Sequence, residues 1–277
     1  MGHESSWLSA VVMHHPSREH RLAELARTSA PLRLRVVSDP DPGGAPSPLR
    51  TAKVAWSAVA EGATHHLVLQ DDVALPDGFA RMLTEAIKHR PDAGIALYVN
   101  WNSPQNAYHA RRAAALGTAW APLSRWEYTP ALGFVLPAAT ARGLGRYLCT
   151  LPDEVRDDDE CITRFCRESG VQVFATVPNL VQHVDGPSLS GYDFHGLRRS
   201  VAFVGDAHAA VDWTVDPALD AALIQRVNEP RATEYVVDFI DGRCAIRFLR
   251  PSFPEPVDHP YSWHWFDWCP LAGVDPH

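Results

Sequence analysis

The chain has 277 residues, 46% hydrophobic and 21% charged, a composition typical of a globular protein with a sizeable core. Its formal net charge of −8 argues against a nucleic-acid partner, because such partners are bound through basic side chains. The sequence has no long apolar run and no basic N-terminal segment followed by an apolar one, so it predicts neither a membrane span nor a signal peptide.

The cysteines give a further indication of class. They are odd in number and show no CxxC spacing: Cys149, Cys161, Cys166, Cys244 and Cys269. A disulfide framework and a zinc site both depend on paired or closely spaced cysteines. We therefore expect reduced thiols in a cytoplasmic protein.

Strand and helix patterns alternate along the first hundred residues. In chain order we predict a buried strand ending at residues 14–16, a helix over 17–30, a strand over 32–38, a helix over 48–61 that closes before Gly62, a strand over 65–73, a helix over 76–92 and a strand over 93–101. In the helix over 76–92, the inward positions are Phe79, Met82, Leu83, Ala86 and Ile87. This alternation favours an α/β fold with a mostly parallel sheet and helices on both faces.

The rhythm breaks at residues 100–128, which we expect to form loops over the sheet. It resumes with a strand over 129–137, helices over 138–151 and 157–170, and a strand with its exit over 171–184. After about residue 192 the pattern becomes irregular and aromatic-rich, with a β-hairpin over 234–251 that turns at Asp241-Gly242. We therefore divide the chain into a main domain, 1–192, and a C-terminal extension, 193–277.

Two adjacent carboxylates, Asp71 and Asp72, follow Gln70 where the strand over 65–73 ends. Doubly wound sheets bind ligands beyond the carboxyl ends of their strands. A divalent cation there would take carboxylate oxygens and complete its shell from a diphosphate, whereas the simpler alternative is a pair that caps the next turn. The chain has neither GxGxxG nor GxxxxGK[ST], which argues against a dinucleotide enzyme and a P-loop NTPase.

A second acidic group, Asp157 to Glu160, opens the helix over 157–170. Acidic residues in a first helical turn interact favourably with the helix dipole, so a purely structural role is one interpretation. Four consecutive carboxylates exceed that need, and one of them could face a cleft as a general base for an acceptor hydroxyl.

The third candidate is His183, at the exit of a strand and before the loop DGPSLSG. A lone histidine is usually structural. In a chain with a carboxylate pair at another strand end, it becomes a candidate metal ligand, and imidazole with carboxylate suits manganese.

Three segments together resemble the GT-A class of nucleotide-sugar glycosyltransferases, and most closely its lipopolysaccharide and procollagen sugar transferases. They are LVLQDDVALPDGF, TPALGFVLPAATARGL and VPNLVQHVDGPSLSG, and the likeness covers roughly residues 8–192. The resemblance implies a GT-A-like nucleotide-sugar-binding and catalytic domain over 1–192. In such enzymes a metal held by a DxD-type motif binds the donor diphosphate.

Residue by residue, the resemblance implies that Asp72 and His183 bind Mn²⁺ or Mg²⁺, while Asp71 supports the metal or reaches the donor ribose. Gln70 stands where an acid is usual in the motif. Asp39, at the end of the second strand, would contact the nucleotide by analogy of fold.

The activity that follows is transfer of a sugar from a UDP-sugar to a hydroxyl of a glycan, small molecule or peptide. Asp158 or Asp159 would be the base, which implies inversion at the anomeric carbon. One alternative is a sugar-phosphate nucleotidyltransferase, which wants a Gly-rich loop and a basic residue after the first strand. The chain has Arg18 there but no such glycines.

A second alternative is a non-catalytic carbohydrate- or nucleotide-binding relative, which the neutral Gln70 keeps open. The extension adds the run HPYSWHWFDWCP, residues 259–270, with three tryptophans. These could stack on a sugar or cover an acceptor pocket, or they could pack on the core.

Overall fold

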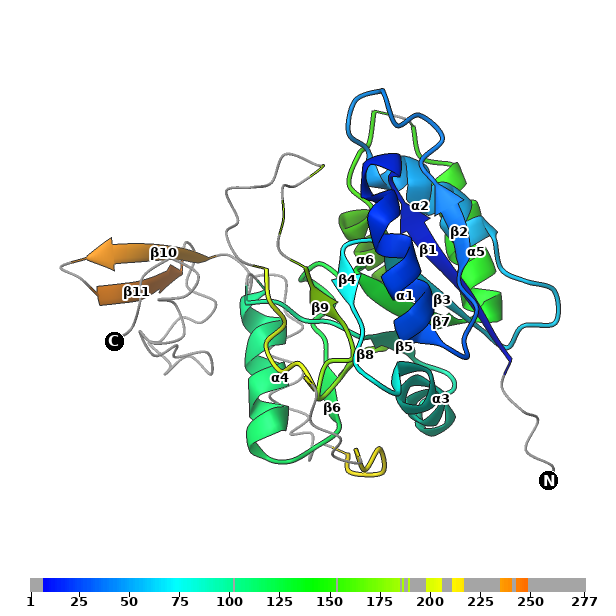
Figure 1. Ribbon diagram of the computed structural model, residues 1–277. Coiled ribbons are helices and arrows are strands. Elements are labelled where there is room, and N and C mark those ends of the chain that lie inside the picture. Colours follow the sequence, from blue (N-terminus) through cyan, green and yellow to red (C-terminus); the bar gives the residue numbers. More distant parts are fainter. Residues whose placement is uncertain are drawn as a thin grey trace.

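The computed structural model describes residues 7–101, 103–152, 154–184, 186, 189, 198–205 and 211–216, together with the backbone of 235–240 and 243–248. These residues form an α/β fold around a mixed seven-stranded sheet (Figure 1).

The strands of the main sheet are β1 (Leu8–His14), β2 (Arg35–Ser38), β3 (His65–Gln70), β5 (Gly94–Ala96), β6 (Trp120–Pro122), β7 (Gly133–Pro137) and β8 (Val173–Thr176). The helices are η1 (Pro16–Arg21), α1 (Leu22–Ser29), α2 (Pro48–Ser57), α3 (Phe79–His89), α4 (Pro104–Ala115), α5 (Ala138–Cys149) and α6 (Asp159–Glu168). Two short ladders stand apart, β4 (Val73–Ala74) with β9 (Gln182–His183) and β10 (Tyr235–Ile240) with β11 (Arg243–Phe248).

The order of the strands is β2-β1-β3-β7-β5-β8-β6. β1 pairs in parallel with β2 and β3, and β5 pairs in parallel with β8. β7 is antiparallel to both β3 and β5, and β6 is antiparallel to β8. Five strands therefore share one direction, and the prediction of a mostly parallel α/β sheet is confirmed.

Helices cover both faces of the sheet, as predicted. Along β1, Val11 and Met13 pack in the cluster that also contains residues of α2, α4, α5 and α6. Their neighbours Ala10 and Val12 point the other way, into the cluster with α1 and α3. All five residues predicted to face inward from α3 are buried.

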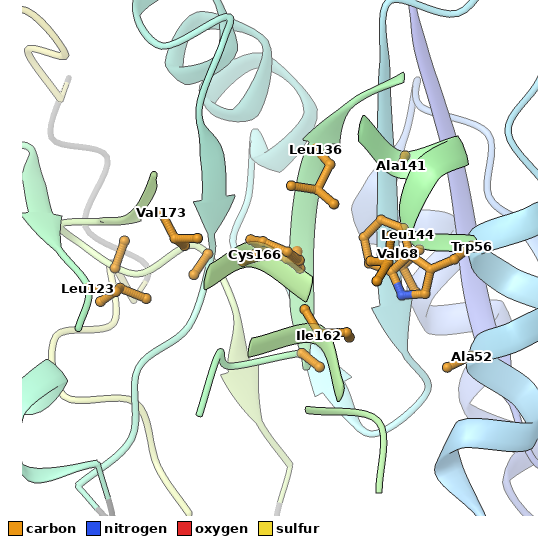
Figure 2. Packing of buried hydrophobic residues seen from close by; sticks show 14 of the residues in the cluster. Ala52, Trp56, Val68, Leu123, Leu136, Ala141, Leu144, Ile162, Cys166 and Val173 are labelled. Carbon is orange, nitrogen blue, oxygen red and sulfur yellow. The ribbon is translucent and has the colours of Figure 1, made fainter. Parts of the chain in front are cut away.

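Trp56 of α2 belongs to the first cluster and is 1% exposed. Figure 2 shows it among Val68 of β3 and Leu144 of α5, and its ring meets that of Phe134 edge-on at 5.9 Å between centroids. The backbones of α2 and α5 approach so closely that a Cβ at Gly145 would lie 2.7 Å from the carbonyl oxygen of Trp56. Glycine is therefore required at this helix crossing.

The prediction of loops over 100–128 is wrong, because the segment contains α4 and β6. α4 packs in the first hydrophobic cluster through three alanines, Ala107, Ala110 and Ala113, which give a weak amphipathic pattern. Its N-terminal amides are satisfied from a distance: a carboxylate oxygen of Glu127 accepts from Gln105 N at 2.9 Å, and the other accepts from Asn106 N at 2.7 Å. Ser103 Oγ also donates to this carboxylate. Because the capping residue Glu127 lies more than 20 residues further along the chain, the sequence around the start of α4 gives no indication of a helix cap.

The C-terminal extension is described in part. β10 and β11 pair antiparallel, Tyr235 opposite Phe248, which confirms the predicted hairpin. Its turn at Asp241-Gly242 and the tryptophan-rich run 259–270 lie outside the described residues. Two other pieces pack on the main domain: Val201 N donates to Val99 O, and Trp213 is buried beside Trp120.

Two expectations from composition can be compared with the described residues. None of the helices in the described part of the chain has the length and apolar character needed to cross a membrane. The three cysteines with described side chains, Cys149, Cys161 and Cys166, are free thiols. The side chains of Cys244 and Cys269 lie outside the described residues.

The contact at Gly145 can be tested with a matched pair on the same helix. Ala at either Gly143 or Gly145 gains about 1 kcal/mol of helix propensity. At Gly143 the new methyl would meet the Phe165 ring at 3.4 Å, an ordinary contact. At Gly145 it would force α2 and α5 apart, and such overpacking typically costs about 1–3 kcal/mol.

We therefore expect Gly145→Ala to lower the free energy of unfolding in urea and Gly143→Ala to preserve or raise it. A Gly145→Ala protein as stable as the wild type would contradict the close crossing of α2 and α5.

Candidate active site

Three parallel strands end at the same edge of the sheet and bring the predicted residues together. Met13 of β1 lies opposite Gln70 of β3, and His14 lies opposite Ser38 of β2. The residues that follow these strands, including Asp39 and Asp71, therefore enter one region beyond the carboxyl ends.

Two cavities adjoin at this edge. The first, about 290 Å³, is lined by Arg18, Asp39, Asp71 and Asp72, among others. The second, about 360 Å³, is lined by Tyr98, Tyr128, Asp158, Asp159 and His183, among others. Gln70 and Arg198 line both cavities, so the two meet at the end of β3.

The adjacent carboxylates share one positive partner. Asp71 and Asp72 are 3% and 6% exposed, so they do not form the solvated strand end that such a pair would suggest. Arg18 Nη1 donates to Asp71 Oδ1 and to Asp72 Oδ2, each at 2.9 Å, and the backbone N of His15 donates to Asp71 Oδ2 at 2.7 Å. One guanidinium thus offsets the repulsion between the two charges. Arg18 follows β1 as the aspartates follow β3, which is the one sequence signal for this contact.

His183 is brought to Asp72 by the small ladder of β4 and β9. Val73 lies opposite His183, and Val184 N donates to Asp72 O at 2.8 Å. His183 Nε2 consequently lies 3.5 Å from Asp72 Oδ2, farther than an ordinary hydrogen bond. The predicted meeting of His183 and Asp72 at one edge of the fold is what the structure shows.

The charge state of Asp72 reflects this setting. Burial works to raise the pKa of Asp72, because it disfavours the ionised form. The imidazole of His183 and the guanidinium groups of Arg18 and Arg198 outweigh burial and hold the pKa below its usual range. Asp72 is therefore an ionised carboxylate at neutral pH.

Unpaired buried atoms test whether a metal fits here. Within the described residues, Asp72 Oδ1 and both ring nitrogens of His183 are buried without a hydrogen-bond partner. Unpaired buried polar atoms are costly, so these point to a ligand. Asp72 Oδ2 lies 3.5 Å from His183 Nε2, and two ligand atoms at this separation can share one ion, because each lies about 2.1 Å from a small divalent metal. In the free protein this same oxygen accepts from Arg18 Nη1, so an ion there would compete with the guanidinium.

The described residues would provide few of the ligands in the coordination shell of such a metal ion. The described residues contain no group of three or more His, Cys, Asp and Glu side chains placed to hold a metal ion. An ion on Asp72 and His183 would have to obtain its remaining ligands from a bound substrate and water.

Asp39 lines the first cavity, but its carboxylate is already engaged. Arg50 donates from Nε to Oδ1 at 2.7 Å and from Nη2 to Oδ2 at 2.8 Å. These hydrogen bonds are the main reason that the pKa of Asp39 is lowered. Arg50 also donates to the carbonyls of Asp41 and Ala45, so the pair fixes the loop between β2 and α2.

The acidic run 157–160 lies on the other side of Gln70. Asp158 occupies the N-cap position of α6, yet its side chain makes no cap hydrogen bond, and its Oδ2 is buried without a partner among the described residues. Burial raises the pKa of Asp158, and repulsion from Asp159 adds to the effect. Burial also raises the pKa of Asp159, although Glu160 N donates to its Oδ1 at 2.8 Å. A helix cap alone does not account for Asp158.

Long-range hydrogen bonds hold this run at the cavity. Leu49 N, at the start of α2, donates to Arg156 O at 2.8 Å. Thr129 N donates to Thr163 Oγ1 of α6 at 2.6 Å. The N-terminus of α6 is thereby fixed beside the segment that leads into β7.

Arg198 and three wall residues of the second cavity were not predicted from the sequence. Ser200 N donates to Gln182 Oε1 at 2.7 Å, which anchors the segment that carries Arg198 to β9. The Tyr98 hydroxyl donates to the carbonyl of Arg198, and the Tyr128 hydroxyl donates to Asn100 Oδ1. Arg198 and Tyr128 lie in segments of irregular pattern, and the strand pattern around Tyr98 and Asn100 gives no indication of contacts with distant residues.

No protein-family model and no curated protein matches this chain, so its function is argued from the site.

Proposed function

We propose that the chain is a metal-dependent glycosyltransferase of GT-A-like fold that moves a sugar from a UDP-sugar to an acceptor hydroxyl, with inversion. The observation that carries the proposal is the meeting of two cavities at Gln70 and Arg198. One contains the carboxylate pair and the other a buried carboxylate suited to act as a base.

The first cavity suits the donor. Its volume of about 290 Å³ is near the lower end of the range for small-molecule sites. Asp72 and His183 would hold Mn²⁺ or Mg²⁺, and the bound ion would neutralise charge on the leaving diphosphate. Arg18 and Arg198 line the same cavity and add positive charge beside the phosphates.

The second cavity suits the acceptor. Asp158 would take the proton of the acceptor hydroxyl as the oxygen bonds to the anomeric carbon and the bond from that carbon to the diphosphate breaks. A carboxylate whose pKa is raised by burial is a stronger base than an ordinary aspartate, which matches this role near neutral pH. Attack from the side opposite the diphosphate inverts the anomeric centre.

Product analysis distinguishes the proposal from its alternatives. Mass spectrometry of mixtures with nucleotide sugars should show UDP release and a glycoside or free sugar. Release of pyrophosphate from UTP and a sugar phosphate would indicate a nucleotidyltransferase, for which Arg18 after β1 is the favourable feature. Binding of UDP without turnover of any donor would indicate a non-catalytic relative.

The metal assignment predicts a loss of cation dependence in Asp72→Asn and His183→Asn. We expect calorimetry to show that Mn²⁺ strengthens UDP binding by the wild type. In either variant, the factor by which Mn²⁺ raises the UDP affinity should be smaller by about tenfold or more. Asparagine has the same size as the Asp72 side chain and is smaller than that of His183, and circular dichroism verifies the fold of both variants. Gln70→Asp should increase the enhancement, because it adds a carboxylate beside Asp72.

Asp39→Asn is the matched control, because Asp39 lines the same cavity but pairs with Arg50. It should change UDP affinity equally with and without Mn²⁺. An unchanged Mn²⁺ enhancement in Asp72→Asn would refute the metal site.

The base assignment predicts that Asp158→Asn loses turnover by about 10²-fold or more and keeps donor affinity. The base must be ionised and its pKa is raised. As the pH decreases, wild-type turnover should therefore begin to fall at a higher pH than it would if the base were an ordinary aspartate. Steady-state rates from pH 5 to 8 measure both effects.

Stability supplies an independent check. A pKa raised in the folded state means that the native protein binds this proton more tightly, so stability falls as pH rises through that pKa. Asp158→Asn should therefore melt at the same or a higher temperature than the wild type at pH 8. Glu168→Gln, at the exposed end of α6, is the control. Turnover near the wild-type rate in Asp158→Asn would exclude Asp158 as the base.

A further inference from the structure

We propose that Arg18 is a built-in counter-ion that makes divalent-cation binding depend on the nucleotide diphosphate. In the free protein Arg18 offsets one of the two negative charges of Asp71 and Asp72, and it becomes a phosphate-binding residue when the diphosphate enters. The identity of the ligand as a nucleotide diphosphate rests on the proposed function above.

Arg18 places a positive charge beside the candidate metal ligands. A single atom, Arg18 Nη1, lies 2.9 Å from oxygens of both aspartates. The side chain of Arg18 is 15% exposed, and those of Asp71 and Asp72 are 4% and 8% exposed. Little water is present to screen these charges, so the guanidinium opposes a second cation on Asp72. It also leaves the carboxylate pair with only one net negative charge.

A bound diphosphate would reverse the repulsion between Arg18 and a metal ion. Arg18 lines the first cavity together with Arg198. In the free protein Arg18 Nη1 occupies Asp72 Oδ2, the oxygen that lies 3.5 Å from His183 Nε2. A diphosphate entering the cavity would take the guanidinium as its own partner and leave this oxygen to an ion, so each cation would then be attracted to the ligand. Arginine suits this task, because its planar fork of donors matches phosphate oxygens.

Repulsion in the free protein and attraction in the presence of the diphosphate couple the binding of the metal ion to the binding of the diphosphate. Each ligand should bind weakly alone and strengthen the other by the same factor, as thermodynamic linkage requires. The neutral Gln70 fits this arrangement, because it adds no charge that would attract a cation before the diphosphate enters.

The test is calorimetry with three titrations: MnCl₂ alone, UDP alone, and UDP in saturating MnCl₂. The proteins are the full-length wild type, Arg18→Gln, Arg18→Lys and Arg27→Gln. Arg27 is the matched control, because it pairs with Glu24 on the surface of α1 and is absent from both cavities.

For Arg18→Gln we expect Mn²⁺ alone to bind about tenfold or more tightly than to the wild type, because the opposing charge is gone. UDP in MnCl₂ should bind about tenfold or more weakly, because a phosphate contact is lost. Arg18→Lys keeps the charge and should retain most of the coupling, and Arg27→Gln should behave as the wild type.

Arg18→Gln leaves two buried carboxylates without their partner, so its fold needs a separate measurement. If it folds only with Mn²⁺, the midpoint of Mn²⁺-induced folding, followed by circular dichroism, is an upper limit on its dissociation constant, because part of the binding free energy drives folding. We expect even this upper limit to lie below the wild-type dissociation constant.

Two results would overturn the role of Arg18: Mn²⁺ binding to Arg18→Gln no tighter than to the wild type, or an unchanged coupling factor. A wild type that binds no UDP in MnCl₂ would instead refute the proposed function, and the titrations with MnCl₂ alone would still decide whether Arg18 opposes the cation.

Discussion

The contact of Arg18 with Asp71 and Asp72 is the interaction on which the cleft depends. Two neighbouring carboxylates that are almost fully buried repel each other and lose contact with water, so they need a positive partner. One guanidinium meets this need for both. Arg18 also connects the segment after β1 to the segment after β3. The carboxyl ends of these strands are therefore joined by an ion pair as well as by the hydrogen bonds of the sheet.

The remaining parts of the cleft are attached to this centre by short, specific contacts. The ladder of β4 and β9 fixes His183 beside Asp72, and Gln182 accepts from Ser200 N to hold the segment of Arg198. In the proposed function Asp72 and His183 supply only two metal ligands, so a bound substrate would complete the coordination shell and become a structural component of the centre.

The sequence predicted those features that follow from local pattern and strand direction. Asp39, Asp71 and Asp72 converge because parallel strands end at one edge, and the apolar face of α3 follows from helical periodicity. The burial of Asp72 was not predictable, because its partner Arg18 is 54 residues away. The antiparallel directions of β6 and β7 also depend on pairing between distant segments, which periodicity does not reveal.

The carboxylate of Glu127 links the N-terminus of α4 to the chain beside Tyr128, which lines the second cavity. Burial raises the pKa of Glu127 to about 7, so ionising it consumes part of the stability that its three hydrogen bonds provide. The helix and this wall of the cavity consequently form one cooperative unit. The amide protons of Gln105 and Asn106 can exchange with solvent only when the wall opens, so motion of the second cavity would be recorded in the hydrogen exchange of a helix outside it.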